Sequence, residues 1–136
     1  MQLTQATDYA FRAALLLAMA GEGEIVDAQT ISSREKIPIR FLLKIMRSLV
    51  QAGIMKSHRG INGGFSLARP PREIALLDIV EAVEGAIRIN RCLLDPDYCS
   101  KHWASHCPVH SALANIQAAI ASEFSRYNLA DLAGKA

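Results

Sequence analysis

The fold is decided by the stretch PIRFLLKIMRSLVQAGIMKSHRGINGGFSLAR, residues 38–69. Its first half predicts a helix from Pro38 to about Ala52, because proline suits a first helical turn and Gly53 suits the position after the last one. Helical spacing separates an apolar stripe of this helix from a polar one; the apolar stripe contains Ile39, Leu42, Leu43, Met46, Leu49 and Val50, and the polar stripe contains Arg40, Lys44, Arg47 and Gln51. Taken alone, such a charged stripe is as often a solvated surface as a binding face.

The second half of the stretch predicts a β-hairpin. Residues 54–59 and 65–69 are short runs of β character, and the glycine-rich residues 60–64 form a flexible connection between them. This hairpin carries Arg59 at its tip. A basic helix followed directly by a hairpin is the order found at the end of a winged helix-turn-helix.

Two more helices are predicted before this stretch. The first spans about residues 4–20 and stops at Gly21, and the second starts after Asp27, a good N-cap, and ends near Arg34. The complete order is therefore that of a winged helix-turn-helix, whereas an ordinary surface hairpin would leave the helix pair unexplained. The helical spacing of the first helix is carried by the apolar residues Tyr9, Phe11, Leu15, Leu16 and Met19. Around the second helix, Ala28, Ile31 and Ile25 are expected to face inward.

Positive charge is concentrated in this part of the chain. Residues 34–72 contain nine basic side chains and one acidic one, a net charge of +8, so the rest of the chain carries −6 within a total of +2. A basic block in an otherwise acidic protein is typical of a surface that binds a polyphosphate. We therefore expect double-stranded DNA as a partner. The candidate contact residues are Arg40, Lys44, Arg47, Ser57, Arg59 and Gly60.

Beyond the hairpin, Pro70-Pro71 breaks the chain and a helix is predicted over residues 76–83. A longer helix over residues 109–127 is apolar along one side and rich in alanine. We interpret it as the seam of a homodimer that binds a palindromic operator, although it could instead close the core of a single chain. The expected fold is mainly α, with a two-stranded wing and a long C-terminal dimerisation helix.

All three cysteines and three of the four histidines lie in residues 91–110, which are predicted to form a loop. Thiolate and imidazole ligands suit both zinc and iron-sulfur clusters. The gaps between the cysteines are longer than in paired zinc knuckles and favour a cluster, although reduced cysteines without a cofactor remain an alternative. His110 follows Cys107 by three residues at a helix start, so these two side chains can converge.

Length and composition exclude several classes of protein. A chain of 136 residues forms one compact unit, which we divide into a DNA-binding region, residues 1–72, and a continuous cluster-binding and dimerisation region, residues 73–136. No segment resembles a signal peptide or membrane span, so we expect a cytoplasmic protein. The sequence lacks a Cys-x-x-Cys, a nucleophile elbow and a phosphate loop, and we expect neither an enzyme nor a small-molecule substrate.

The whole chain resembles the IscR/NsrR family of iron-sulfur winged-helix regulators. The resemblance is carried by MQLT and TDYA near the start, FLLKI in the basic helix, RGINGGFSL in the hairpin and NLADL at the end, residues 1–4, 7–10, 41–45, 59–67 and 128–132. It implies a DNA-binding dimer whose basic helix enters the major groove while Arg59 reaches the minor groove. Leu43 departs from members that carry a glutamate there, so no operator sequence is implied.

The resemblance also implies a cluster held by Cys92, Cys99 and Cys107. Regulators of cluster biogenesis use a histidine as fourth ligand, which matches His110, whereas nitric-oxide sensors use an aspartate from the partner subunit, which matches Asp8. We favour His110 and a [2Fe-2S] over a [4Fe-4S] cluster. The expected function is a transcriptional regulator, with repressor as the expected mode, that senses cluster status and controls cluster biogenesis genes. The alternatives are a nitric-oxide-sensing repressor of the same family, a zinc-stabilised interaction module and a thiol redox enzyme.

Overall fold

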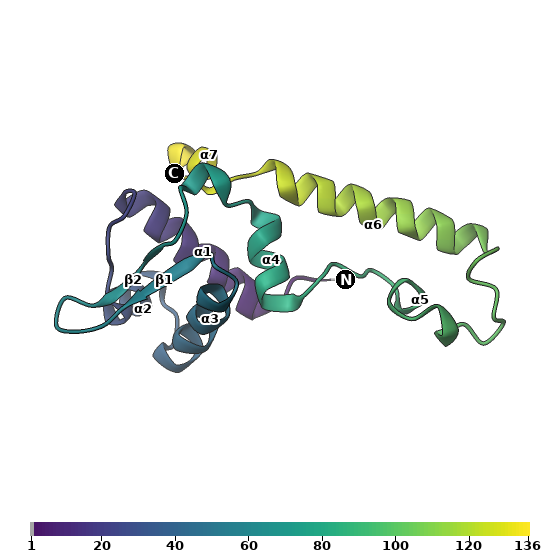
Figure 1. Ribbon diagram of the computed structural model, residues 1–136, viewed down its shortest axis with the longest axis horizontal. Helices are drawn as coiled ribbons and strands as arrows, with labels where there is room; N and C mark the ends of the chain where they lie inside the picture. Colours follow the sequence, from purple (N-terminus) through teal and green to yellow (C-terminus); the bar gives the residue numbers. More distant parts are fainter. Residues whose placement is uncertain (1) are drawn as a thin grey trace.

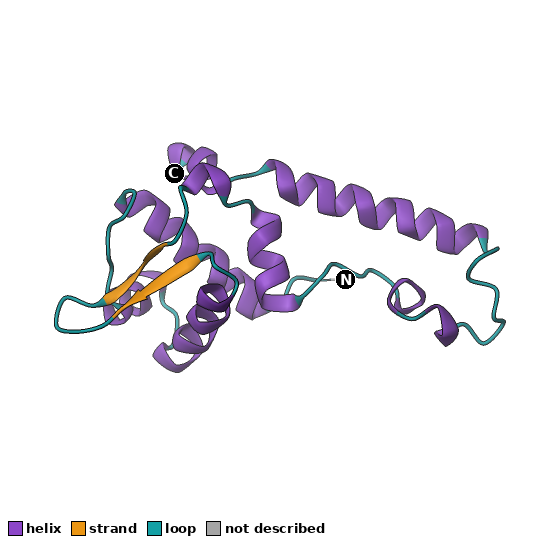
Figure 2. Cartoon of the chain, viewed as in Figure 1, coloured by secondary structure: helices purple, strands orange, loops and turns teal. Residues whose placement is uncertain are grey.

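The computed structural model describes residues 2–136 as a mainly helical chain with one two-stranded sheet (Figures 1 and 2). This confirms the predicted winged helix-turn-helix class. Between residues 2 and 136, no helix is long and apolar enough to cross a membrane. The elements are α1 (Gln5–Ala20), α2 (Ala28–Glu35), α3 (Ile39–Gln51), β1 (Met55–His58), β2 (Gly64–Leu67), η1 (Pro71–Glu73), α4 (Leu76–Glu84), α5 (Arg91–Leu94), η2 (Pro96–Tyr98), α6 (Pro108–Arg126) and α7 (Leu129–Lys135).

Side-chain caps explain where the first two helices begin. The hydroxyl of Thr4 accepts the backbone N–H of Thr7 at 3.2 Å and so caps α1. The carboxylate of Asp27 accepts the backbone N–H of Thr30 at 3.1 Å and its hydroxyl at 2.6 Å, which caps α2 as predicted. These bonds satisfy N–H groups that have no partner within their own helix.

The core forms around α1, which packs against α2, α3, α4 and α7. Ala10 lies one helical turn before Ala13 and Ala14, and none of the three has any exposed surface. Their small side chains let the neighbouring helices approach closely. Met19, one of the apolar residues that indicated this helix, is 56% exposed at the end of α1. Ile25, which was predicted to face inward, is 42% exposed.

The apolar side of α3 is rotated relative to the predicted stripe. Leu42, Met46 and Leu49 are buried as predicted, but Leu43 is 44% exposed and Ile45 is buried instead. The physical reason is helical geometry, since Ile45 lies between Leu42 and Leu49 on the helix surface and Leu43 lies beside Arg47. Leu43 therefore belongs to the cationic face of α3.

The hairpin of β1 and β2 is antiparallel, with Met55 opposite Leu67 and His58 opposite Gly64. Val26 extends this sheet, because its N–H and C=O exchange hydrogen bonds of 2.9 Å with the backbone of Phe65. At Gly64 a Cβ atom would lie 2.3 Å from the carbonyl oxygen of Val26, so only glycine permits this approach. The wing is thus tied to the segment that leads into α2.

Residues 85–126, here called the arm, extend away from the rest of the chain, here called the head (Figure 1). Helix α6 packs against α4 and α5, and none of its residues is buried. The predicted loop between Arg91 and His110 contains the short helices α5 and η2. The division after residue 72 stays a prediction, and the structure shows in addition that α4 and α7, both beyond it, pack on α1.

The chain returns from the arm into the head beside the start of α4. The backbone N–H of Leu76 donates to the carbonyl of Tyr127 at 2.9 Å, and the N–H of Leu129 donates to the carbonyl of Ile74 at 3.0 Å. Helix α7, which the sequence analysis did not predict, then packs on α1 and η1. Its local signal is Asn128, whose side chain accepts the backbone N–H of Asp131 at 2.9 Å.

The other end of α4 is attached to α1 through Glu84. Its carboxylate accepts the backbone N–H of Thr4 at 3.1 Å, the hydroxyl of Thr4 at 3.2 Å and the hydroxyl of Thr7. Burial alone raises the pKa of Glu84, but the bonds from Thr7 and Thr4 outweigh it, so the pKa lies below its usual 4.5. The ionised carboxylate also lies at the N-terminus of α1, where the helix dipole favours negative charge.

The lowered pKa of Glu84 predicts a pH-dependent contribution to stability. Above pH 4.5 the carboxylate is ionised in both folded and unfolded chains, and Glu84→Gln should lower the free energy of unfolding by about 1 kcal/mol. As the pH falls through the lower folded pKa, the wild-type carboxyl becomes protonated and this difference should shrink. Urea unfolding of both proteins at several pH values measures it, and a difference that grows on acidification would contradict the assignment.

Candidate functional site

The cationic side chains predicted on α3 share one exposed face. Arg40, Lys44 and Arg47 are all exposed, whereas the opposite side of α3 is buried in the core. Phe41 and Leu43 are also exposed, at 57% and 44%. Sequence reasoning missed these two as surface residues, although the high apolar content of α3 was a signal that more apolar side chains were present than one buried face holds.

The wing adds a second part to this surface. Ser57, Arg59 and Gly60 are exposed, as is Ile61 at the tip. Within the hairpin, an imidazole nitrogen of His58 lies 2.8 Å from the hydroxyl of the buried Ser66. This bond joins β1 to β2 just before Arg59 and steadies the base of the flexible tip.

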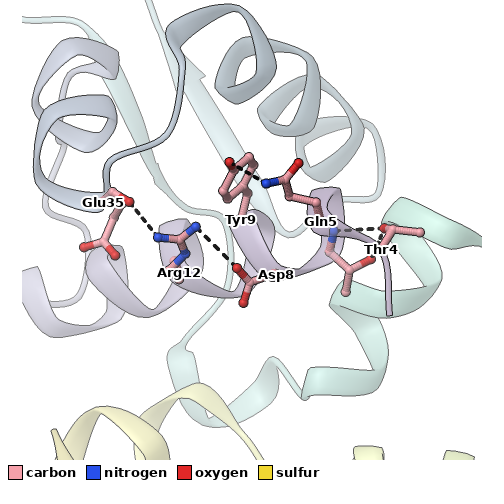
Figure 3. Close-up of polar contacts among 7 residues, drawn as sticks. Thr4, Gln5, Asp8, Tyr9, Arg12 and Glu35 are labelled. Carbon is pink, nitrogen blue, oxygen red and sulfur yellow. Dashed lines mark hydrogen bonds and ion pairs between the residues drawn. The ribbon is translucent and has the colours of Figure 1, made fainter. Parts of the chain in front are cut away.

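Arg12 of α1 contacts the end of α2, just before α3. Its guanidinium donates to the backbone carbonyl of Glu35 at 2.8 Å and lies 3.3 Å from the carboxylate of Asp8 (Figure 3). The same guanidinium lies over the ring of Tyr9, 4.8 Å from its centre. The carbonyl of Glu35 is a free acceptor at the end of α2, so Arg12 caps that helix and holds it against α1.

The predicted cluster ligands line one cavity in the arm. Cys92, Cys99, Cys107 and His110 contribute to a cavity of about 500 Å³ between α5, η2 and the start of α6. The Nδ1 atom of His110 lies 3.2 Å from the Sγ atom of Cys92. All four side chains are half-buried, and the three thiols are free of disulfide bonds. The structure therefore brings together four residues that span 19 positions of the sequence.

The thiol of Cys99 has a distinct environment. Backbone N–H groups of Trp103 and Lys101 point towards its sulfur and lower the pKa of Cys99, with smaller contributions from the N–H of His102 and the charge of Lys101. The chain turns sharply here, and His102 has a φ of 51°. The turn following Cys99 thus favours its thiolate, the form that binds metals.

The donor set of this cavity fits an iron-sulfur cluster, since it combines soft thiolates with an imidazole. Across residues 2–136, however, no three Cys, His, Asp or Glu side chains converge closely enough to hold a single metal ion. The alternative ligand Asp8 is not among the residues that line the cavity, and it pairs with Arg12 in the head. Ligation by Asp8 would require a second subunit.

Comparisons with known proteins agree on one class of protein. Residues 3–135 match the sequence profile of the Rrf2 family, described as an iron-dependent transcriptional regulator. An HTH-type transcriptional regulator of Aquifex aeolicus is 35% identical over 124 residues, which cover 91% of this chain and 85% of that protein. Two solved structures are similar in fold only. IscR of T. potens is 24% identical, with a TM-score of 0.78, and the match covers 99% of this chain and 88% of that one. CymR, the global cysteine regulator of B. subtilis, is 20% identical, with a TM-score of 0.77, and the match covers 100% of this chain and 98% of that one.

Proposed function

Because this chain belongs to the Rrf2 family of DNA-binding transcriptional regulators and is not an enzyme, we propose that α3 and the wing contact an operator under the control of the cysteine cavity. The observation that carries this proposal is the shared exposure of the basic side chains on α3 and the wing. The resemblance noted in the sequence, to iron-sulfur members of this family, is confirmed at the level of the family.

The proposed contacts divide into two kinds. Arg40, Lys44 and Arg47 of α3 enter the major groove, where an α-helix fits and where arginine and lysine recognise guanine or phosphate. Arg59 reaches the adjacent minor groove, and Ser57 and Gly60 lie against the phosphate backbone. The net charge of +8 over residues 34–72 supports this placement, because phosphate contacts supply most of the non-specific affinity for DNA.

We propose that α6 forms the seam of a homodimer. Val109 and Ile116 are 63% and 49% exposed on α6. Ile116 also lines an almost wholly apolar hollow, together with Ile120 and Phe124. An apolar helix that buries no residue in its own chain favours a partner over a role in the monomer core. A two-fold pair of α3 helices then matches a palindromic operator.

The cavity of the arm is the proposed sensor. Cys92, Cys99, Cys107 and His110 would hold an iron-sulfur cluster, with [2Fe-2S] favoured, and such a cluster supplies sensitivity to iron, oxidants or nitric oxide. The family description as iron-dependent supports iron as the metal. The close pair of Cys92 and His110 supports histidine as the fourth ligand. A cluster held through Asp8 of the partner subunit, typical of nitric-oxide sensors, is the second candidate.

Arg59→Ala should weaken operator binding and flatten its salt dependence. Loss of one phosphate-proximal cation should reduce the slope of log K against log salt by about 0.9. The operator can be obtained by selection from random duplexes and the affinity measured by fluorescence anisotropy between 50 and 200 mM salt, a range of the order used to resolve such slopes. Arg88→Ala, a change of the same size in the arm, is the control and should leave the slope unchanged. An unaltered slope in Arg59→Ala would rule out its proposed role.

Ile116→Glu should separate the dimer into monomers, because it places a charge in the apolar seam. Ser122→Glu is the matched control, since Ser122 is exposed on the opposite side of α6. Sedimentation velocity at micromolar protein measures the mass of each variant. Dimers that persist in Ile116→Glu, or monomers formed equally by both variants, would argue against this face of α6 as the seam.

Replacement of Cys92, Cys99 and Cys107 by alanine should abolish bound iron and acid-labile sulfide in anaerobically purified protein, together with visible absorbance. The head should stay folded, since these thiols lie in the arm, and the protein should stay dimeric, since they precede α6 and lie outside the proposed seam. His110→Ala should reduce cluster retention, whereas His106→Ala, an exposed neighbour outside the cavity, should not. Loss of the cluster in Asp8→Asn, with retention of the cluster in His110→Ala, would instead favour ligation through Asp8 of the partner subunit. Stoichiometric zinc in the wild type would overturn the cluster assignment.

A further inference from the structure

The surface that would bind DNA and the cavity that would sense a signal lie far apart. The tip of the wing and the segment that precedes α6 are at opposite ends of the long axis of the chain (Figure 1). Helix α4 lies between them and packs against α6 of the arm as well as α1 and α3 of the head. Any change in the arm that alters the placement of α4 is therefore passed directly to the helix that carries Arg40, Lys44 and Arg47.

The two ends of α4 are attached in physically different ways. At its start, backbone bonds join residues 74–76 to residues 127–129, and the side chain of Asp78 accepts the N–H of Ala75 at 2.9 Å. At its end, the attachment to α1 is the carboxylate of Glu84 with its bonds to Thr4 and Thr7. Gly85 follows at a φ of 84°, and the chain continues as the coil that leads to Cys92.

The Glu84 attachment joins an exposed carboxylate to a buried hydroxyl. Thr7 has no exposed surface, so its hydroxyl depends on Glu84 and, at 3.2 Å, on the hydroxyl of Thr4. Glu84 itself is exposed and lies on a cavity of about 600 Å³ that is also lined by Leu3 of the head and Phe124 of the arm. A movement of the arm at Gly85 therefore acts next to the exposed carboxylate of Glu84, which is the hydrogen-bond partner of the buried hydroxyl of Thr7.

We propose that the contact of Glu84 with Thr4 and Thr7 is the joint that couples the arm to the DNA-contacting helix α3. Glu84 is in this sense a positioning residue, since it acts on α3 through α4 and touches neither DNA nor the cysteine cavity. While the joint is closed, α4 holds a defined angle against α1 and α3. When it opens, the arm moves without displacing α3. The biological consequence rests on the proposed function, but the coupling itself does not require bound DNA or a bound cluster.

The experiment perturbs the arm and observes the head in DNA-free, full-length protein. Alkylation of the cysteines with N-ethylmaleimide should change amide hydrogen exchange in α3 and in the first turn of α1 of the wild type. Thr7→Val has the same shape without the hydroxyl and should lose this response, whereas Thr7→Ser retains a hydroxyl and should keep it. Glu84→Gln, which leaves the buried position intact, should also reduce the response if Thr7→Val fails to fold.

A purely structural role predicts something different, namely faster exchange in Thr7→Val both before and after alkylation, with an unchanged difference between the two. That result, or a wild type whose α3 does not respond to alkylation, would overturn the proposed coupling.

A second experiment perturbs the head with DNA and observes the arm, with Trp103, the single tryptophan of the chain, as the reporter. Binding of the selected operator should alter acrylamide quenching of Trp103 in wild type and Thr7→Ser and leave it unaltered in Thr7→Val. Absence of DNA binding would overturn the proposed function and leave the exchange result to decide the joint.

Discussion

The close packing of helices on the alanine face of α1 is the constraint on which the rest of the structure depends. Ala10, Ala13 and Ala14 are completely buried, and α3, α4 and α7 all pack on this helix. A larger side chain at any of the three would separate these helices and create strain or cavities in a core of this size. Because α3 and α4 share this support, the proposed surface for DNA and the attachment of the arm are built on one scaffold.

This scaffold separates the cationic surface from the cysteine cavity. The cationic side chains of α3 and the wing are exposed, whereas the thiols lie half-buried along a cavity at the other end of the chain. Polar contacts at α1 connect the two regions. Arg12 holds α2 through the carbonyl of Glu35 (Figure 3). Thr4 and Thr7 hold α4 through Glu84. Helix α1 thus serves as a common support for α2, α3, α4 and α7.

Much of the fold could be predicted because its signals are local. Caps such as Asp27, the proline before α3, the glycines of the wing and the helical spacing of α6 each act over a few residues, and the corresponding elements were confirmed. The errors arose where several faces of a helix are apolar. Leu43 and Ile45 differ little in hydrophobicity, so composition did not indicate which of them faces the core. Helix α7 was missed because its stability comes from packing on α1 and η1.

By itself, the sequence determined the class of the protein: the winged helix-turn-helix order, the concentration of positive charge in residues 34–72 and the gathering of all cysteines near residues 92–107 are properties of neighbouring residues. Only the tertiary structure decided how these parts are connected. The bonds from Thr4 and Thr7 to Glu84, and from residues 127–129 to residues 74–76, join positions about 50 to 80 apart in the sequence. No local propensity encodes such pairs, because their partners meet only after the helices have packed.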